Sequence, residues 1–365
     1  MPINEKLITP EVLNNTLRKE IYPEVKVIAL PKKGKVRSIY DIGNNQLLMM
    51  SSDDLSTHDV VHKRQVYAKG GNLDAISSNC FEKTGHIIPN HFIRDVAPNT
   101  WLVRKAERIL VEIVFRSYIT GSGWRDYVKV NGPEEGAMVS GVSIRPGYRK
   151  NEKLDDVIFT PAAKGQVKDF LSVPEMQKMV DNAKPEDREK TLNTDDPKLT
   201  EETIRNNYKA FGLRKPEDLD YIAEKSFQLF DSISRDLESR GYLLADTKWE
   251  FGYFPDGTIG LIDECVTPDS SRIWGKAQYE FNPEKSEFII VQNDKQPFRD
   301  YVEALGLDED KEALAAHWMA DEVLKAGVIR YCNIREKITG TLPEITTTPR
   351  KDIILEALGD AGYLR

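Results

Sequence analysis

The chain has 365 residues, 40% hydrophobic and 30% charged, a length and composition that suit a globular protein of two or three domains rather than a disordered or fibrous one. The net charge of −8 argues against a broad nucleic-acid-binding surface, which would need a basic stripe. The N-terminal segment carries charges from Glu5 onward and lacks the apolar run of ~7 to 15 residues that a signal peptide needs. We therefore expect a cytoplasmic protein without a membrane or nucleic-acid partner.

The first predicted unit is an antiparallel, β-rich lobe over residues 1–110. Turn signals at Lys33-Gly34 and Gly43-Asn44-Asn45 bound the apolar run 47–50 and predict a β-meander within 25–59. β-branched residues predict a further strand pair, at 101–103 and 109–119. Lys35 and Arg37 follow the first turn on one face of the hairpin, where they could neutralise phosphates. A role as plain surface charges is equally compatible with this pattern.

The second predicted unit spans residues 111–305, with an antiparallel sheet and a cleft between it and the first lobe, which makes the fold class α+β. A polar stretch over 174–216 predicts a surface insertion. Apolar residues at helical spacing from Leu219 to Leu237, followed by Gly241, predict an amphipathic helix. Residues 306–365 predict a helical extension that packs on the core or on a partner subunit. Composition leaves the oligomeric state open, a homo-oligomer included.

The three cysteines carry no chemical signal of their own. Cys80, Cys265 and Cys332 lie far apart in the chain and form no CxxC pair. Neither a disulfide framework nor a thiolate metal site is therefore predicted. We expect reduced, buried thiols.

The segment 244–272 carries the most chemistry. Asp256-Gly257 between two β-rich runs predicts a hairpin with a two-residue type I′ turn. That turn would place Glu250 directly opposite Asp263, and two facing carboxylates favour a cation between them, with magnesium suited to all-oxygen ligands. Lys248 would share the face of Glu250. The alternatives are ordinary solvated strand charges, or a three-residue loop that shifts the register and separates the two carboxylates.

Two further segments suit the binding of an anion. At residues 267–272 a strand ends in small hydroxyl residues and Arg272, and at 116–124 Arg116 leads into a serine between two glycines. Backbone N–H groups, hydroxyls and guanidinium groups of this kind bind phosphate. A helix cap or a plain turn remains an alternative at each. The sequence contains no GxxxxGK[ST], GxGxxG, HExxH or GxSxG motif, which leaves P-loop, Rossmann, zinc-protease and serine-hydrolase functions without support.

Six motifs in order resemble the signature blocks of the phosphoribosylaminoimidazole-succinocarboxamide synthase (SAICAR synthase) family. They are KGKVRSIYD, SSDDLSTHD, RSYITGSGW, FTPAAK, LADTKWEFG and LIDECVTPDSSRIW, spread over about residues 30 to 275. The resemblance implies a ligase of purine synthesis. From ATP, carboxyaminoimidazole ribotide and L-aspartate, such an enzyme makes SAICAR, ADP and phosphate through an acyl phosphate. Catalysis of this type depends mainly on positioning and charge neutralisation.

The resemblance also implies roles for individual residues. The predicted catalytic residues are Lys248, near the transferred phosphoryl group, Asp269, near the ribotide, and Asp59, which with Ser56 and Asp53 would line the cleft. Predicted ATP-binding residues are Gly34, Lys35, Arg37, Arg104, Ala106, Glu250 and Asp263, with Arg104 to Ala106 meeting adenine through the backbone. Glu250 and Asp263 would hold Mg2+. Predicted ribotide-binding residues are Arg116, Ser122, Gly123, Ser271 and Arg272.

The chain departs from the family pattern in two places. Asp54 and His58 stand where the pattern SDRxSxFD has arginine and phenylalanine, and FTPAAK is not followed by His-Asp. These departures leave the orientation of the amine substrate open. Two other functions are alternatives to the ligase. A small-molecule kinase would need an HRDxxxxN-like run, which the sequence lacks, and a non-catalytic nucleotide-binding module would not need two separate phosphate-type turns.

Overall fold

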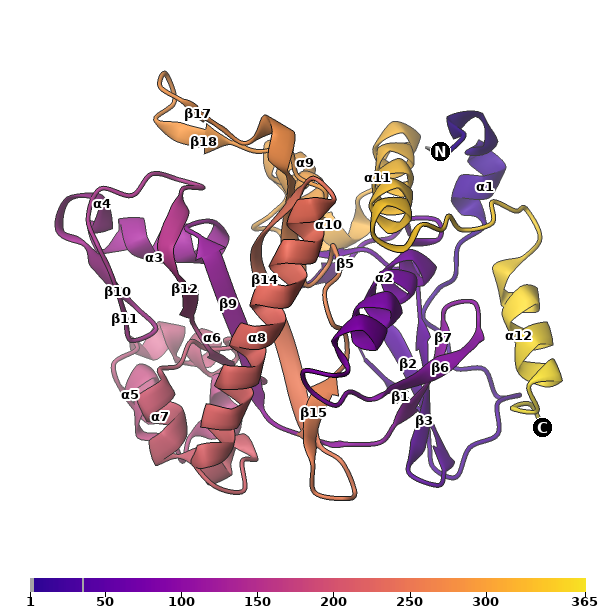
Figure 1. Ribbon diagram of the computed structural model, residues 1–365, viewed down its shortest axis with the longest axis horizontal. Helices are drawn as coiled ribbons and strands as arrows, with labels where there is room; N and C mark the ends of the chain where they lie inside the picture. Colours follow the sequence, from indigo (N-terminus) through magenta and orange to yellow (C-terminus); the bar gives the residue numbers. More distant parts are fainter. Residues whose placement is uncertain (1–2, 35) are drawn as a thin grey trace.

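The computed structural model describes residues 3–34 and 36–365 and has a mixed α/β fold built on antiparallel sheets (Figure 1). The N-terminal part forms a five-stranded sheet in the order β1-β2-β3-β7-β6. Its strands are β1 (Lys32–Lys33), β2 (Arg37–Gly43), β3 (Gln46–Ser51), β6 (Phe92–Ala97) and β7 (Thr100–Arg104). The predicted meander is confirmed, since β2 pairs with β3 in antiparallel register across the Asn44-Asn45 turn.

The seven-stranded sheet runs β12-β9-β14-β15 along its main path, and β13, β16 and β8 pair at its sides. Its strands are β8 (Glu107–Arg108), β9 (Val111–Tyr118), β12 (Lys153–Phe159), β13 (Ala162–Ala163), β14 (Tyr242–Tyr253), β15 (Ile259–Ile262) and β16 (Ser271–Gly275). The predicted pairing of 101–103 with 109–119 is wrong. Strand β7 belongs to the first sheet and β9 to the second, because β9 pairs with the long strand β14.

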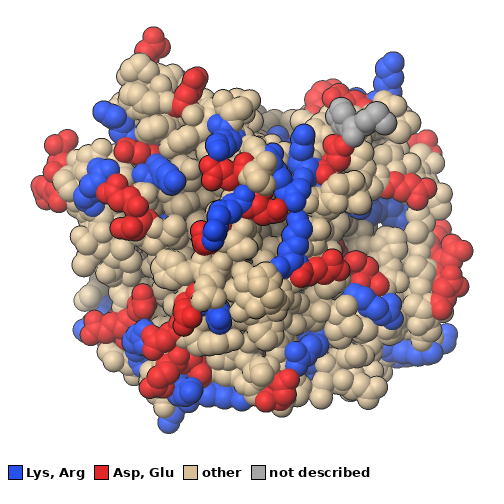
Figure 2. Space-filling view, viewed as in Figure 1, with Lys and Arg blue, Asp and Glu red and all other residues tan. Residues whose placement is uncertain are grey.

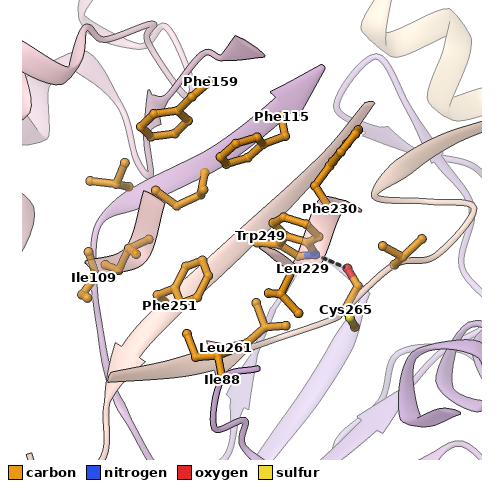
Figure 3. Packing of buried hydrophobic residues seen from close by; sticks show 14 of the residues in the cluster. Ile88, Ile109, Phe115, Phe159, Leu229, Phe230, Trp249, Phe251, Leu261 and Cys265 are labelled. Atoms are coloured by element: carbon orange, nitrogen blue, oxygen red, sulfur yellow. Dashed lines mark hydrogen bonds between the residues drawn. The ribbon is translucent and has the colours of Figure 1, made fainter. Parts of the chain in front are cut away.

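Strands β9 and β14 separate packing from chemistry by alternation. Side chains at odd positions, among them Phe115, Trp249 and Phe251, lie in the main hydrophobic core, as Figure 3 shows. The predicted helix is confirmed as α8 (Glu217–Ser239), whose residues Leu229 and Phe230 pack in the same core. The even positions from Glu112 to Arg116 and from Asp246 to Glu250 therefore face the other side of the sheet.

The helices α2 (Lys69–Thr84), α11 (Asp321–Thr339) and α12 (Arg350–Asp360) connect the C-terminal extension to the first sheet. Helix α11 lies beside α2 (Figure 1) and contributes Tyr331 and Cys332 to a core shared with the N-terminal residues Val12 and Leu13. Helix α12 packs near β6. The extension thus packs on the core of the chain, which is one of the two predicted arrangements.

The polar stretch 174–216 is helical, with α5 (Pro174–Asp181), α6 (Arg188–Leu192) and α7 (Glu201–Asn206). Most of its surface is exposed, but Met176, Ile204 and Phe211 are buried in the main core. The segment therefore has apolar anchors that its charge obscures in the sequence.

Short elements complete the fold. They are α1 (Pro10–Asn14), α3 (Gly121–Lys129), α4 (Gly132–Glu135), α9 (Gln296–Ala304), α10 (Lys311–Ala316), and the hairpin strands β4 (Ser56–Thr57), β5 (Val60–Val61), β10 (Ala137–Val139), β11 (Val142–Ile144), β17 (Glu280–Asn282) and β18 (Glu287–Ile289). Among the described residues, no helix is both long and apolar enough to cross a membrane. Acidic and basic side chains are interspersed over the face drawn in Figure 2.

The cysteine prediction is wrong for two of the three residues. Cys80 on α2 and Cys265, just after β15, form a disulfide with their Cα atoms 6.0 Å apart. Their sequence separation of 185 residues hides this proximity, because only the packing of α2 against the second sheet brings them together. Cys332 is a free, buried thiol as predicted.

Candidate active site

A cavity of about 960 Å³ lies on the face of the seven-stranded sheet opposite to α8. The even positions of β9 and β14 form its floor, and the segments after β15, before β16 and at the start of α9 form much of its wall. Its chemistry-bearing lining residues include Ser56, Asp59, Glu112, Arg116, Ser122, Lys164, Asp196, Asp246, Lys248, Glu250, Asp263, Asp269, Ser271, Arg272, Lys295 and Arg299. Most of the predicted site residues thus share one cavity.

The predicted register of the β14–β15 hairpin is wrong by one residue. Glu250 pairs with Ile262 instead of Asp263. The loop is longer than the predicted two residues, because Phe254 N–H donates to Thr258 O at 2.8 Å and Gly257 closes the turn at φ +84°. A turn followed by a left-handed glycine is the usual form of a three-residue hairpin loop.

The two carboxylates nevertheless face the same cavity. Asp263 lies just beyond β15 with φ +65°, which redirects its side chain relative to a regular strand. Burial, and next the charge of Asp263, raise the pKa of Glu250, so the two carboxylates interact electrostatically. The path of the chain here is fixed by Trp249, whose Nε1 donates to Cys265 O at 2.8 Å (Figure 3).

Arg37 lies beneath Asp263. Its guanidinium contacts the carboxylate of Asp263 and lies 3.4 Å from Glu264 Oε1, while its Nε donates to Ser51 Oγ at 3.2 Å. Burial alone would raise the pKa of Asp263, but Arg37 and then Lys164 hold it below its ordinary value. Arg37 is not among the lining residues, so in this structure it orients Asp263, and its predicted contact with phosphate stays a prediction.

Lysine and glutamate residues alternate at one end of the cavity. Lys164 Nζ lies 2.7 Å from Glu112 Oε1 and 2.9 Å from Glu250 Oε1, and Lys248 Nζ lies 2.8 Å from the same Glu112 oxygen. Burial opposes charge on Lys164, but Glu250 and then Glu112 raise its pKa above the ordinary value. The two lysines and two glutamates thus form a cluster of close ion pairs on one face of the sheet, and the ammonium groups in it suit the binding of a triphosphate.

Two arginines share one carboxylate at the opposite side of the floor. Arg116 and Arg272 lie 2.8 and 2.5 Å from the same oxygen of Asp246, and Arg116 also donates to Ser122 Oγ at 3.1 Å. Gly121 permits this packing, since a Cβ there would lie 2.2 Å from the Arg272 guanidinium. Two guanidinium groups around one carboxylate leave a net positive charge, which suits a phosphate.

The turn before β16 is held by internal bonds. Lys69 Nζ lies 2.8 Å from Asp269 Oδ2, and Tyr331 Oη donates to Oδ1 at 2.7 Å. Ser271 Oγ lies 2.8 Å from Thr247 Oγ1. Asp269 therefore lines the cavity with both oxygens engaged by the protein, which makes it a positioning group for the turn in this structure.

The β4–β5 hairpin brings Ser56, His58 and Asp59 to the cavity. His58 and Asp59 occupy its two-residue turn, with φ +47° and +62°. Asp53 does not reach the cavity. It is fully buried, and its carboxylate accepts the N–H groups of Leu17 and Gly70, so the predicted lining role is wrong for this residue.

The remaining predicted ligands lie elsewhere. Gly34 is in the β1–β2 turn, where its N–H donates to Arg37 O at 2.8 Å. Arg104 pairs with Asp256 at 2.9 Å, and neither it nor Ala106 lines the cavity. Gly123 packs on the Arg116 side chain. Lys35 lies outside the described residues, so its role stays a prediction.

Sequence reasoning missed several charged residues of the cavity, namely Glu112, Lys164, Asp196, Asp246, Lys295 and Arg299. Asp246 could have been found, because it precedes Lys248 and Glu250 at the same two-residue spacing. Asp196 could not, since it follows a long excursion whose ends meet at the Gln166–Asp195 bridge. That closure places a carboxylate directly beside Gly165, whose N–H it accepts at 3.3 Å.

Comparison with known proteins gives the family. A family model described as SAICAR synthetase matches residues 30–315. The chain belongs to the SAICAR synthetase family. It is accordingly a carbon–nitrogen ligase of purine biosynthesis, and the resemblance stated from the motifs is confirmed.

Individual members of the SAICAR synthetase family match over most of their length. The phosphoribosylaminoimidazole-succinocarboxamide synthase of Methylobacillus flagellatus is 31% identical over 334 residues, covering 88% of this chain and 97% of the relative. That of Vibrio cholerae is 33% identical over 338 residues, covering 87% and 83%. The solved SAICAR synthase from Saccharomyces cerevisiae complexed with SAICAR has a TM-score of 0.67 at 26% identity, covering 90% of this chain and 99% of that one.

Proposed function

We propose that the protein joins L-aspartate to carboxyaminoimidazole ribotide at the expense of ATP, through an acyl phosphate, giving SAICAR, ADP and phosphate. The observation that carries the proposal is the floor of the cavity. There, two adjacent strands present a lysine–glutamate cluster and an arginine pair on one face. A phosphoryl-transfer end and a phosphate-anchoring end within one cavity suit a reaction between two phosphorylated substrates.

In the first step, an oxygen of the ribotide carboxylate attacks the γ-phosphorus of ATP, and the bond to the ADP oxygen breaks. Lys164 and Lys248 would neutralise the charge that spreads over the transferred phosphoryl oxygens. Arg116, Arg272 and Ser122 would hold the ribotide phosphate and thereby fix the carboxylate relative to ATP. Positioning of this kind supplies much of the rate enhancement in phosphoryl transfer.

In the second step, the amine nitrogen of aspartate attacks the acyl carbon, the amide bond forms and phosphate leaves. The nitrogen must lose a proton. Asp196 lines the cavity in electrostatic contact with Glu112 and both lysines, and burial followed by Glu112 raises its pKa. A carboxylate with a raised pKa is a suitable proton acceptor, so we assign this role to Asp196.

Magnesium fits the carboxylate pair. Glu250 and Asp263 are oxygen ligands on one cavity wall, and their mutual repulsion, visible in the raised pKa of Glu250, would be relieved by a cation. No group of three or more potential metal ligands occurs among the described residues, so phosphate oxygens and water would complete the coordination. When bound, the ion would neutralise charge on the triphosphate.

We also propose a division of labour along the chain. Residues 1–110 would serve mainly the nucleotide, residues 111–305 magnesium and the ribotide, and residues 306–365 would support the site. The last assignment is supported by the Tyr331–Asp269 hydrogen bond.

The test is a reconstitution with purified protein. ADP should form only when ATP, the ribotide and L-aspartate are all present with magnesium, and mass spectrometry should detect the succinocarboxamide. ADP release without incorporation of aspartate would overturn the ligase assignment.

A further inference from the structure

A buried carboxylate lies one layer below the residues that line the cavity. Asp74 is on the second turn of α2 and is 3% exposed. It does not line the cavity and belongs to none of the motifs that pointed to the family. Its Oδ1 accepts a hydrogen bond from Ser51 Oγ at 2.7 Å, while its Oδ2 has no hydrogen-bond partner among the described residues. A buried carboxylate with so few hydrogen bonds destabilises a fold, and this cost points to a role in the neighbouring site.

Ser51 connects Asp74 to Arg37. Ser51 and Arg37 face each other across β2 and β3, and Arg37 Nε donates to Ser51 Oγ at 3.2 Å. A serine hydroxyl has one hydrogen and two lone pairs. Because Asp74 accepts the hydrogen, a lone pair of Ser51 remains for the N–H of Arg37. Without Asp74 the hydroxyl is free to rotate, and a hydrogen turned toward Arg37 would oppose that N–H.

Arg37 continues the connection to the wall of the site. Its guanidinium contacts the Asp263 carboxylate and lies 3.4 Å from Glu264 Oε1. Burial alone would lower the pKa of Arg37, but Asp263, then Glu264 and Asp74, raise it above its ordinary value. The planar guanidinium is thus held through Nε, Nη1 and Nη2. Loss of the partner at Nε would therefore let the group turn and move the Asp263 carboxylate with it.

The connection depends on the acceptor oxygen of Asp74 more than on its charge. Burial raises the pKa of Asp74 to about 7, against the lowering effects of Arg37 and of the Ser51 hydrogen bond, and Asp95 and Glu264 add to the increase. Both the neutral and the ionised acid keep a lone pair on Oδ1. Ser51 can therefore donate to Asp74 in either state.

We infer that Asp74 is a positioning residue for the magnesium site, where it fixes the orientation of the Asp263 carboxylate through Ser51 and Arg37. The inference rests on the proposed function, which assigns Asp263 to magnesium, and deepens it. Arg37 holds Oδ1 of Asp263, which leaves Oδ2 for the ion. The direction of that oxygen is set by a chain of contacts that begins on α2.

The experiment compares Asp74→Ala, Ser51→Ala and their double variant with the unmodified protein and with Asp218→Ala. Asp218 is the matched control, because it is also a buried aspartate on a helix, accepts from a hydroxyl, Tyr253 Oη, at 2.6 Å, and does not line the cavity. Calorimetry measures the binding of Mg2+ to each protein with a non-hydrolysable ATP analogue bound, without turnover. Each single variant should bind Mg2+ about 3- to 10-fold more weakly, because a hydrogen bond that orients a ligand is lost. The control should match the unmodified protein.

The double variant tests whether Asp74 acts through Ser51. If it does, the second substitution should weaken Mg2+ binding by less than a further factor of about two, because the connection is already broken. Effects of the two substitutions that multiply would show that Asp74 acts independently of Ser51 and would overturn the inference. Asp74→Asn keeps the volume and an acceptor oxygen, so it should retain the Mg2+ affinity within about twofold. An Asp74→Asn variant as weak as Asp74→Ala would also overturn the route through the hydrogen bond.

Steady-state kinetics separate positioning from a general loss of stability. In Asp74→Ala the Mg2+ concentration that gives half the maximal rate should rise about 3- to 10-fold, while the KM values for the ribotide and L-aspartate change less than about twofold. An unmodified protein that makes no succinocarboxamide, or binds no Mg2+, would overturn the proposed function. An active protein whose Mg2+ binding is the same in Asp74→Ala would overturn only the role of Asp74. Near-ultraviolet circular dichroism checks that each variant is folded, and Ser51→Ala with Asp74→Asn decides the question if Asp74→Ala is not.

Discussion

The cations at the β9–β14 end of the cavity and those at the start of α9 differ in how closely they are paired with carboxylates. Around β9 and β14, Lys164 and Lys248 lie within 2.7 to 2.9 Å of the Glu112 and Glu250 carboxylates. At α9, Lys295 has only a 3.9 Å contact with Asp269. The first end must exchange internal ion pairs for ligand contacts when a nucleotide binds, whereas the second presents charge that is already available to an anion. Binding at the first end should therefore reorganise side chains, and binding at the second should not.

The largest expected effect comes from Asp263→Asn. The change removes one charge of the carboxylate pair and its contact with Arg37, and turnover should fall by at least about 100-fold, as when a preorganised charge is removed from an active site. The measurement is kcat with all three substrates, together with the magnesium dependence. Asp256→Asn, at the exposed turn of the same hairpin, is the control and should retain activity. Near-normal turnover in Asp263→Asn would remove this residue from the site.

The second effect concerns the internal pairs themselves. Glu112→Gln leaves Lys164 and Lys248 without their shared partner, so unfolding free energy should fall by about 2 kcal/mol at pH 7. Burial alone would raise the pKa of Glu112, but Lys248 and then Lys164 hold it below its ordinary value. The carboxylate therefore stabilises the fold above the unfolded-state pKa of about 4.3, and this contribution is lost as the pH falls through the lower folded-state value.

Urea unfolding between pH 3 and 7 measures this dependence. The difference between unmodified protein and Glu112→Gln should be largest at pH 7 and shrink in acid. Glu107→Gln, which removes an exposed partner of Arg214, should show a small difference at every pH. A Glu112→Gln difference that does not vary with pH would mean that packing, not charge, holds this cluster.

The sequence predicts the cavity floor better than its walls, for a physical reason. Period-two alternation along β14 places Lys248 and Glu250 on one face whatever the neighbouring strands do. The β14–β15 register, in contrast, depends on whether Asp256-Gly257 forms a two- or three-residue loop, and both loops suit that dipeptide. The redirecting φ at Asp263 follows from tertiary packing, which no local pattern encodes.

The rest of the cavity wall is formed by contacts between distant parts of the chain, which local sequence patterns do not predict. Asp196 reaches the site only because the chain returns at the Gln166–Asp195 bridge. The prediction of a helical extension over 306–365 does not give the bounds of α11 (Asp321–Thr339), because its buried residues, such as Tyr331 and Ile334, are separated by charged ones. Lys295 stands out only after Asp269 is seen to be engaged by residues far away in the sequence.

The smallest expected effect concerns the hydrogen bonds that keep Asp269 from pairing closely with Lys295 at the start of α9. Tyr331→Phe removes the hydroxyl that donates to Asp269 Oδ1 at 2.7 Å, which frees that oxygen for Lys295. Lys295 would then offer less charge to an anionic substrate. The KM of at least one of the three substrates should rise about 3- to 10-fold, a change of about 1 kcal/mol, while kcat stays near that of the unmodified protein. Tyr301→Phe, which removes a hydroxyl near His317 Nε2 at 3.3 Å, is the control. A fall in kcat with unchanged KM values would show that Tyr331 serves the turn before β16 alone, and that the charge of Lys295 is not kept available by the hydrogen bonds of Asp269.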